Sequence, residues 1–301
     1  MRNVGLDVLK ILAVVAVVLL HAIWVWPWAD KISFVVLDQF LRFCVPLFVA
    51  ISGYGLMIGY GRKLDLLGFL RKRLGRLLPW YLIVATTTIL LVTFVWKEAE
   101  ALYRGASVWK LYLLGQADYH LYFVPMIIQL YLLFPVFLFL FKKIPPKILV
   151  LLVLIGQIWW YGYIGSRVEN STDNNSLWPD QMQYRYFISW VYYFVLGMFL
   201  AGSKKTYCGM GFVLCIVGLG LSIINSTALL TTGVNVVTAL RFTRISILIF
   251  STGVIFLGKA LMEKLTVSPV GEKLLAKLAN YSYLIYLWHP IALRVISRLA
   301  G

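Results

Sequence analysis

The chain has 301 residues, of which 61% are apolar and only 13% are charged. A soluble domain carries about twice that share of charged residues, so the composition excludes an ordinary soluble protein and predicts a polytopic helical membrane protein. The net charge of +16 could suggest nucleic acid as a partner. The cations lie mainly in short connections between apolar runs, which is typical of cytoplasmic loops of membrane proteins and argues against nucleic-acid binding.

Apolar runs of about 17 to 25 residues, long enough to cross a bilayer, occur about nine times. They lie near 4–26, 37–60, 77–96, 121–141, 148–164, 184–202, 208–225, 237–258 and 281–299. We predict an all-α, polytopic membrane bundle of about nine to ten transmembrane helices, formed by a single domain over residues 1–301 without an appended soluble domain. The segment 259–279 has lysines opposite an apolar face and is predicted to be an amphipathic interfacial helix.

Basic residues gather in alternate connections between these runs. They are Arg62, Lys63, Arg71, Lys72, Arg73 and Arg76 after the second run, Lys142, Lys143 and Lys147 after the fourth, Lys204 and Lys205 after the sixth, and Lys259, Lys264, Lys273 and Lys277 after the eighth. Because basic loops stay in the cytoplasm, these connections and the N-terminus are predicted to be cytoplasmic. The connections 97–119 and 165–183 are predicted to be external.

The first apolar run carries three polar side chains that lipid disfavours, Asp7, Lys10 and His21. Ionisable residues inside a span are costly, and they tend to face protein or a water-filled cavity and to serve a function. Asp7 and Lys10 share a helix face and can pair. His21 follows Lys10 by about three turns, roughly 16 Å, on nearly the same face. One face therefore presents a charge pair near one end and a titratable imidazole toward the other.

The second run contains Arg42, with Asp38 one turn earlier as a partner within reach. Pro46 and Ser52-Gly53 follow in the middle of the run, and such kinking or small residues let backbones approach each other or line a cavity. The alternative is a charge pair that only locks two helices together.

Before the third run, the segment 71–80 places four cations at the predicted cytoplasmic mouth of a span. Arg73 and Arg76 share a helix face. Such clusters commonly contact lipid phosphates. The functional alternative is a binding site for a polyanionic ligand such as the phosphates of coenzyme A, because the guanidinium fork fits phosphate.

The chain has three histidines, His21, His120 and His289, each in or at the end of an apolar run. They lack carboxylates at ligand spacing, so no metal site is predicted. His120 could instead be an interfacial imidazole bonded to water, and His289 a structural hydrogen-bonding group. Arg241 and Arg244, predicted inside the eighth run, either snorkel to the interface or belong to an anionic or sugar-lipid substrate site.

Five short motifs occur in the order known from one family. They are Asp7 with Lys10 and, after ten intervening residues, His21; Arg42 with Pro46-Leu-Phe and Ser52-Gly53-Tyr54; Arg73-Leu-Gly-Arg76; His120-Leu-Tyr122-Phe; and Tyr281-Ser-Tyr-Leu-Ile-Tyr-Leu-Trp-His289-Pro. Together they resemble the membrane acyltransferase-3 superfamily of bacterial integral-membrane O-acyltransferases. The sequence departs from that pattern where Lys10 replaces arginine, where Tyr122 replaces tryptophan, and where the chain stops before the usual tenth span.

The resemblance implies transfer of an acyl group, acetyl above all, from cytoplasmic acyl-CoA to a hydroxyl of a cell-surface glycan or glycolipid precursor at the bacterial cytoplasmic membrane. Acyl-CoA would be a co-substrate, without a bound cofactor. His21 would act as general base or carry the acyl group covalently, with Lys10 and Asp7 setting the field along its face. Arg73 and Arg76, together with Arg71, would bind the CoA phosphates. The further candidates for substrate binding or oxyanion stabilisation are Arg42, Ser52, His120, Tyr122, Arg241, Arg244 and His289.

A membrane transporter or flippase is the alternative, because intramembrane charges and broken helices serve transport equally well. The sequence lacks internal pseudo-symmetry and has the cationic mouth before the third run, and both features favour the enzyme. The predicted partners are membrane lipid, acyl-CoA and a glycan or lipid-linked sugar acceptor.

Overall fold

The computed structural model describes residues 3–25, 31–103, 105–169 and 183–300. Every regular element of these residues is helical, which confirms the all-α prediction. The long helices are α1 (Val4–Val25), α3 (Cys44–Tyr60), α4 (Leu66–Leu90), α7 (Phe123–Lys143), α8 (Pro146–Glu169), α11 (Cys208–Thr231), α13 (Ile245–Lys264) and α14 (Pro269–Ala300). The shorter elements are α2 (Lys31–Leu41), α5 (Ala99–Tyr103), α6 (Val108–Leu113), α10 (Val191–Gly202), α12 (Val236–Ala239), the π-helical turn η1 (Leu91–Val95) and the 3-10 turn η2 (Phe187–Ser189).

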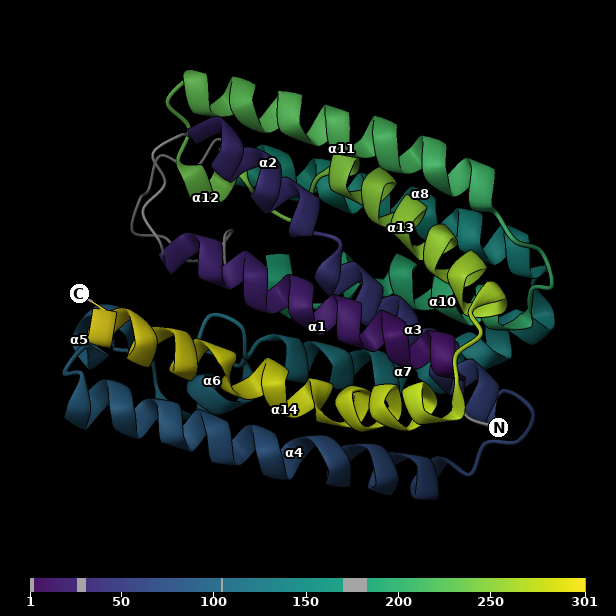
Figure 1. Ribbon diagram of the computed structural model, residues 1–301, viewed down its shortest axis with the longest axis horizontal. Coiled ribbons are helices and arrows are strands. Elements are labelled where there is room, and N and C mark those ends of the chain that lie inside the picture. Colours follow the sequence, from purple (N-terminus) through teal and green to yellow (C-terminus); the bar gives the residue numbers. More distant parts are fainter. Residues whose placement is uncertain (1–2, 26–30, 104, 170–182, 301) are drawn as a thin grey trace.

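Most of the long helices run side by side along the long axis of the molecule, and the two termini lie at opposite ends (Figure 1). We call the end that holds the N-terminus the N-terminal end of the bundle. The connections after α3, α10 and α13 lie at this same end, in agreement with the alternation of basic loops. Most of the predicted external connection 165–183 falls on residues outside the described part of the chain.

Among the described residues, seven segments are long and apolar enough to cross a membrane. They are Val4–Val25, Lys31–Tyr60, Leu66–Val95, Phe123–Lys143, Pro146–Arg167, Cys208–Thr231 and Ile245–Lys264. Each of the seven overlaps one of the predicted runs. The predicted runs 184–202 and 281–299 do not qualify on the same criteria.

The run 184–202 is helical over a shorter stretch than its hydropathy predicts, because α10 begins only at Val191 and has 12 residues. The residues before it are held by the side chain of Gln129 on α7. Its amide nitrogen donates to the Arg185 carbonyl at 3.0 Å, and its amide oxygen accepts from the Phe187 N–H at 3.1 Å. A side chain thus supplies hydrogen bonds that a helix would otherwise provide.

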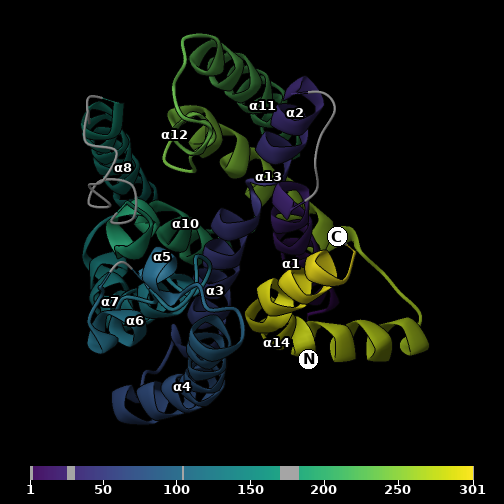
Figure 2. The same ribbon diagram turned by 90° about the vertical axis from the view of Figure 1, so that its left-hand side faces the viewer.

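The run 281–299 is the second part of α14, a continuous helix of 32 residues that begins at Pro269. The predicted interfacial segment 259–279 is therefore divided between the end of α13 and the start of α14. Lys259, predicted in a loop, instead lies within α13, is buried, and pairs with Glu263 at 2.8 Å. The first part of α14 extends sideways, across the direction in which the long helices run (Figure 2).

The predicted span 237–258 is interrupted, and this corrects the position of two arginines. Residues 240–244 are not helical, so Arg241 and Arg244 lie in a break between α12 and α13, outside a regular span. Both are buried, and Arg244 Nη2 donates to the Thr238 carbonyl at 3.2 Å. Irregular backbone is tolerated at membrane depth only where protein satisfies its polar groups. Arg244 contributes to this by bonding the carbonyl of Thr238.

The second predicted span is also interrupted, at residues 42–43 between α2 and α3. Pro46 lies in the first turn of α3, where a backbone N–H has no partner within the helix, so that a proline there costs no hydrogen bond. A proline at this place prevents the α2 helix from continuing, because its ring clashes with the carbonyl four residues earlier. The break turns the chain between two helices that a hydropathy window reads as one span.

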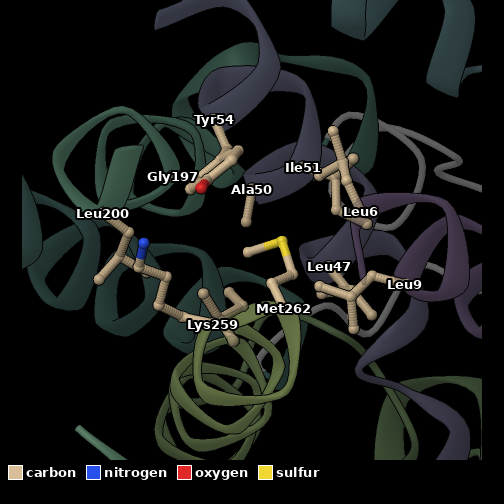
Figure 3. Close-up of a pocket in the computed structure, with 11 residues that line it drawn as sticks. Leu6, Leu9, Leu47, Ala50, Ile51, Tyr54, Gly197, Leu200, Lys259 and Met262 are labelled. Carbon is tan, nitrogen blue, oxygen red and sulfur yellow. The ribbon is translucent and has the colours of Figure 1, made fainter. Parts of the chain in front are cut away.

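Helices α3 and α10 pack backbone to backbone through glycines. A Cβ at Gly53 would collide with the Phe194 carbonyl oxygen, and a Cβ at Gly197 would collide with the carbonyl oxygen of Ala50. Figure 3 shows Gly197 beside Ala50 and Tyr54, with the Lys259 side chain entering from α13. The expectation that Ser52-Gly53 allows close helix approach is therefore confirmed at Gly53.

Candidate functional site

A cavity of about 450 Å³ lies between α1, α3, α4, α7 and α14, toward the N-terminal end of the bundle. We call it the N-terminal cavity. Its polar wall includes the side chains predicted to bind a donor, and its deeper wall is aromatic. The polar and charged lining residues are Asn3, Asp7, Lys10, Ser52, Arg73, Arg76, Tyr131, Asn280, Ser282, Tyr283 and Tyr286. The volume is within the range of small-molecule binding sites.

The charge pair of α1 forms one side of this cavity. Lys10 Nζ lies 3.2 Å from Asp7 Oδ1, and Asp7 is 3% exposed while Lys10 is partly exposed. The pairing predicted from their spacing is confirmed. Across the cavity, Arg73 and Arg76 come from the first half of α4. Lys10, Arg73 and Arg76 against the single carboxylate of Asp7 give the lining a net charge of +2.

The Arg73 guanidinium packs against aromatic rings, and one of its hydrogen-bond donors has no partner among the described residues. Its guanidinium carbon lies 5.6 Å from the centre of the Tyr60 ring and 6.0 Å from that of Tyr131. Among the described residues its buried Nε has no hydrogen-bond partner. Arg71, the third predicted phosphate ligand, is exposed and is not part of the cavity wall. The cavity therefore presents two of the three predicted arginines.

The deep wall of the cavity is closed by three rings, Phe48 on α3, Phe123 on α7 and Tyr286 on α14. Their centres are 5.2 Å apart for Phe123 and Tyr286, 6.0 Å for Phe48 and Phe123, and 6.2 Å for Phe48 and Tyr286. We call these three side chains the aromatic partition. They were not singled out from the sequence, because aromatic residues are frequent in every apolar run.

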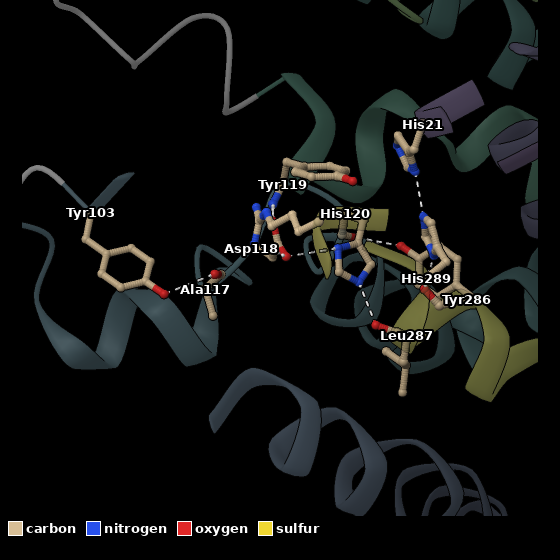
Figure 4. Close-up of polar contacts among 10 residues, drawn as sticks. His21, Tyr103, Ala117, Asp118, Tyr119, His120, Tyr286, Leu287 and His289 are labelled. Carbon is tan, nitrogen blue, oxygen red and sulfur yellow. Dashed lines mark hydrogen bonds and ion pairs between the residues drawn. The ribbon is translucent and has the colours of Figure 1, made fainter. Parts of the chain in front are cut away.

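On the other side of the partition, the three histidines meet, although they are far apart in the chain (Figure 4). His21 Nδ1 lies 2.6 Å from His289 Nε2, and the two rings are stacked. The His120 ring centre lies 5.2 Å from that of His289. His120 and His289 are buried, whereas His21 is partly exposed beside Tyr119, which is 47% exposed. We call His21, His120 and His289 the histidine cluster.

The hydrogen bonds around His289 assign the positions of the ring protons. His289 Nδ1 can only donate to the Tyr286 carbonyl, 2.7 Å away, so a neutral His289 keeps Nε2 as an acceptor. His21 must then donate from Nδ1 to His289, which leaves His21 Nε2 unprotonated. Among the described residues His21 Nε2 makes no hydrogen bond. Of the unprotonated nitrogens in the cluster, His21 Nε2 thus belongs to the partly exposed ring, whereas His120 Nδ1 is buried.

His120 is held by a backbone carbonyl and lies near a buried carboxylate. Its Nε2 donates to the Leu287 carbonyl at 3.1 Å, and Asp118 Oδ2 lies 3.9 Å from its Nδ1. Asp118 accepts two bonds from Arg294 of α14, at 2.7 and 3.1 Å. Burial raises the pKa of Asp118, and the neighbouring Arg294 opposes that shift. In the described chain, no group of histidines, cysteines and carboxylates is arranged to hold a metal ion.

Asp118 and Arg294 were missed in the sequence, although signals for both existed. Asp118 precedes His120 by two residues, and Arg294 is a cation inside a predicted apolar span, five residues after His289. A charge in a span needs a partner. Its partner Asp118 lies in the predicted external connection 97–119, so the search would have to include the connections as well as the spans.

The other predicted site residues have separate locations. Arg42 donates from Nε and Nη2 to buried Asp38, at 2.5 and 3.0 Å, which confirms the predicted pair. Asp38 also accepts from Trp24 of α1 at 2.8 Å, so the pair ties α2 to α1. Tyr122 packs in an aromatic group with Tyr184 and Trp190 and does not line the N-terminal cavity.

The chain matches one protein family over nearly its whole length. A family model for an acyltransferase domain matches residues 3–301. The chain is also 26% identical over 253 residues to YfiQ of Bacillus subtilis (strain 168), a candidate membrane-bound acyltransferase. That match covers 83% of this chain and 67% of the relative. No solved structure matches the chain significantly.

Proposed function

Because this chain belongs to the acyltransferase family whose model spans residues 3–301, we propose that it transfers an acyl group, acetyl in the first instance, from acyl-CoA to a sugar hydroxyl. The acceptor is a cell-surface glycan or glycolipid precursor, and the protein works in the cytoplasmic membrane of a bacterium. Family membership confirms the resemblance inferred from the five motifs. The donor, the acceptor and the mechanism are part of the proposal.

The observation that carries the proposal is the Arg73 guanidinium in the N-terminal cavity. Its buried Nε has no partner among the described residues, and the lining carries net positive charge. Arginine binds phosphate through charge-assisted hydrogen bonds of defined geometry. We assign the cavity to the phosphates and pantetheine arm of acyl-CoA, bound by Arg73, Arg76 and Lys10. The N-terminal end of the bundle then faces the cytoplasm, as the basic connections predict.

The chemistry takes place at the histidine cluster. His21 Nε2 takes the proton of the acceptor hydroxyl while the hydroxyl oxygen attacks the thioester carbonyl carbon. The tetrahedral intermediate collapses with cleavage of the carbon–sulfur bond. The thiolate of CoA takes the proton back from His21, so that the products are the O-acyl ester and free CoA. His289 Nε2 accepts a hydrogen bond from the Nδ1–H group of His21. This bond stabilises the imidazolium that forms on His21.

Arg42 has a different role in this proposal. Two of its nitrogens are committed to Asp38, so the pair holds α1 and α2 together and does not stabilise an oxyanion. The half-buried position of His21 beside exposed Tyr119 leaves the acceptor an approach from the end opposite the N-terminal cavity. Donor and acceptor therefore reach His21 from opposite ends.

The test uses purified full-length protein with radiolabelled acetyl-CoA and octyl glucoside as an amphiphilic sugar acceptor. We expect release of CoA thiol and the appearance of labelled octyl glucoside ester, both lost in His21→Ala. Saturable binding of acetyl-CoA without any release of CoA thiol, whether the acyl acceptor is the sugar or water, would contradict the enzyme and favour the transporter.

A further inference from the structure

The N-terminal cavity and the histidine cluster are separated by a single layer of side chains. Tyr286 lines the cavity, yet its hydroxyl donates to the His120 carbonyl and its own carbonyl accepts from His289 Nδ1. Its ring centre lies 5.5 Å from that of His120 and 5.9 Å from that of His289. One residue thus contacts both places, and Phe48 and Phe123 complete the layer.

The reacting group of a donor in the cavity must cross this layer. Lys10 lines the cavity and His21 lies about 16 Å further along α1. Between them, Ala13, Val14 and Val17 are buried at 0, 4 and 1% exposure. The α1 side therefore offers a closed apolar wall, and the path from the cavity to His21 leads past the aromatic partition.

The three rings of the partition are not held equally. Tyr286 is fixed by its hydroxyl and by the backbone bond to His289. The rings of Phe48 and Phe123 are held by apolar packing without a side-chain hydrogen bond, and both residues are partly exposed. Side-chain rotation of the two phenylalanines is therefore the smallest movement that opens a passage between the two places.

We propose that the aromatic partition selects the acyl group by size, so that an acetyl thioester passes Phe48 and Phe123 while a medium or long acyl chain is excluded. The inference rests on the proposed function of the same site and names its donor class as short-chain acyl-CoA. With either donor the pantetheine arm follows the thioester between the rotated rings. An acetyl group then adds only one methyl group beyond the thioester carbonyl, whereas a longer chain must also find room among the packed rings and the buried histidines, at a cost in packing.

The experiment compares kcat/KM for acetyl-CoA and octanoyl-CoA, with octyl glucoside as acceptor, in wild type, Phe48→Ala and Phe123→Ala. The wild type is expected to prefer acetyl-CoA. Each alanine variant should raise the ratio of octanoyl to acetyl transfer by about tenfold or more, since even one methylene in an apolar pocket changes selectivity by roughly that factor.

The matched control is Phe43→Ala. Phe43 is partly exposed like Phe48 and precedes α3 directly, but it packs on Phe40 and Phe250, both 6.2 Å away, and does not line the cavity. The Phe43→Ala variant should have the same ratio of octanoyl to acetyl transfer as the wild type. If the alanine variants do not fold, Phe48→Leu and Phe123→Leu replace them, with an expected increase of about threefold.

The outcomes separate the two proposals. If the wild type transfers neither acyl group, the proposed function fails. If the wild type transfers acetyl and octanoyl equally well, or if the partition variants keep the wild-type ratio while remaining active with acetyl-CoA, the proposed function stands and selection by the partition is overturned.

Discussion

At the scale of single residues, the contact between His21 and His289 determines which nitrogen of His21 can act as a base. His289 is oriented by the backbone, because its Nδ1 donates to the Tyr286 carbonyl at 2.7 Å. It can therefore offer only Nε2 to His21, which fixes the tautomer of His21 and leaves its Nε2 free as a base. In our proposal His289 is a positioning residue, because it acts on the acceptor through His21.

We predict that His289→Leu lowers kcat by about 100-fold, within the range attributed to general acid–base catalysis, and leaves the KM for acetyl-CoA unchanged. Loss of the acceptor allows the unproductive tautomer of His21. His289→Gln retains an acceptor oxygen near the position of Nε2 and should recover part of the rate. Steady-state kinetics of the two variants provide the check. A rise in KM without loss of kcat, or equal rates for leucine and glutamine, would contradict the positioning role.

At this scale the sequence predicts pairs of residues one helical turn apart well, and contacts between residues far apart in the chain poorly. The pairs Asp7–Lys10 and Asp38–Arg42 follow from helical spacing alone. The contact between His21 and His289 joins residues 268 positions apart, and nothing in the periodicity of either helix specifies the other. The sequence predicts that both histidines are polar groups in apolar runs and need partners, without indicating which partners they have.

At the scale of elements, hydropathy locates the apolar runs but does not report where their backbone ceases to be helical. Between α12 and α13, buried arginines sit in a non-helical turn that the sequence reads as part of one span. Before α10, Gln129 bonds the backbone of a neighbouring segment and makes a helix unnecessary there. Before α10 the polar side chain comes from another helix, so the missing information is tertiary. Between α12 and α13 the bond of Arg244 to the Thr238 carbonyl is local, but the burial of both arginines depends on the rest of the fold.

The packing of α10 on α3 gives a prediction about stability. A methyl group at Gly197 would meet the Ala50 backbone, which cannot yield without separating the helices. We therefore expect Gly197→Ala to destabilise the protein by about 1–3 kcal/mol, the typical cost of overpacking. Thermal unfolding of purified protein in detergent measures the effect. Gly202→Ala on the same helix is the control, since a Cβ there meets nothing within 4 Å. Equal melting temperatures of the two variants would refute the close helix contact.

At the scale of the whole molecule, the proposed site has two ends joined across the aromatic partition. The N-terminal cavity gathers Lys10, Arg73 and Arg76, and the histidine cluster lies beyond Tyr286. The motifs predict the members of both ends, because each motif carries its own polar residue. They do not predict the cavity or the partition, which arise only when α1, α3, α4, α7 and α14 are packed together.

The most direct test of this account measures binding and transfer separately, with radiolabelled acetyl-CoA, in wild type, His21→Ala, Arg73→Ala and Arg71→Ala. We predict that His21→Ala binds acetyl-CoA as the wild type does but transfers no acetyl group. Arg73→Ala should weaken binding by about tenfold or more, as expected for loss of a charge-assisted hydrogen bond, whereas exposed Arg71→Ala should behave like the wild type. Transfer by His21→Ala at the wild-type rate, or binding by Arg73→Ala as tight as by Arg71→Ala, would contradict the two-ended site.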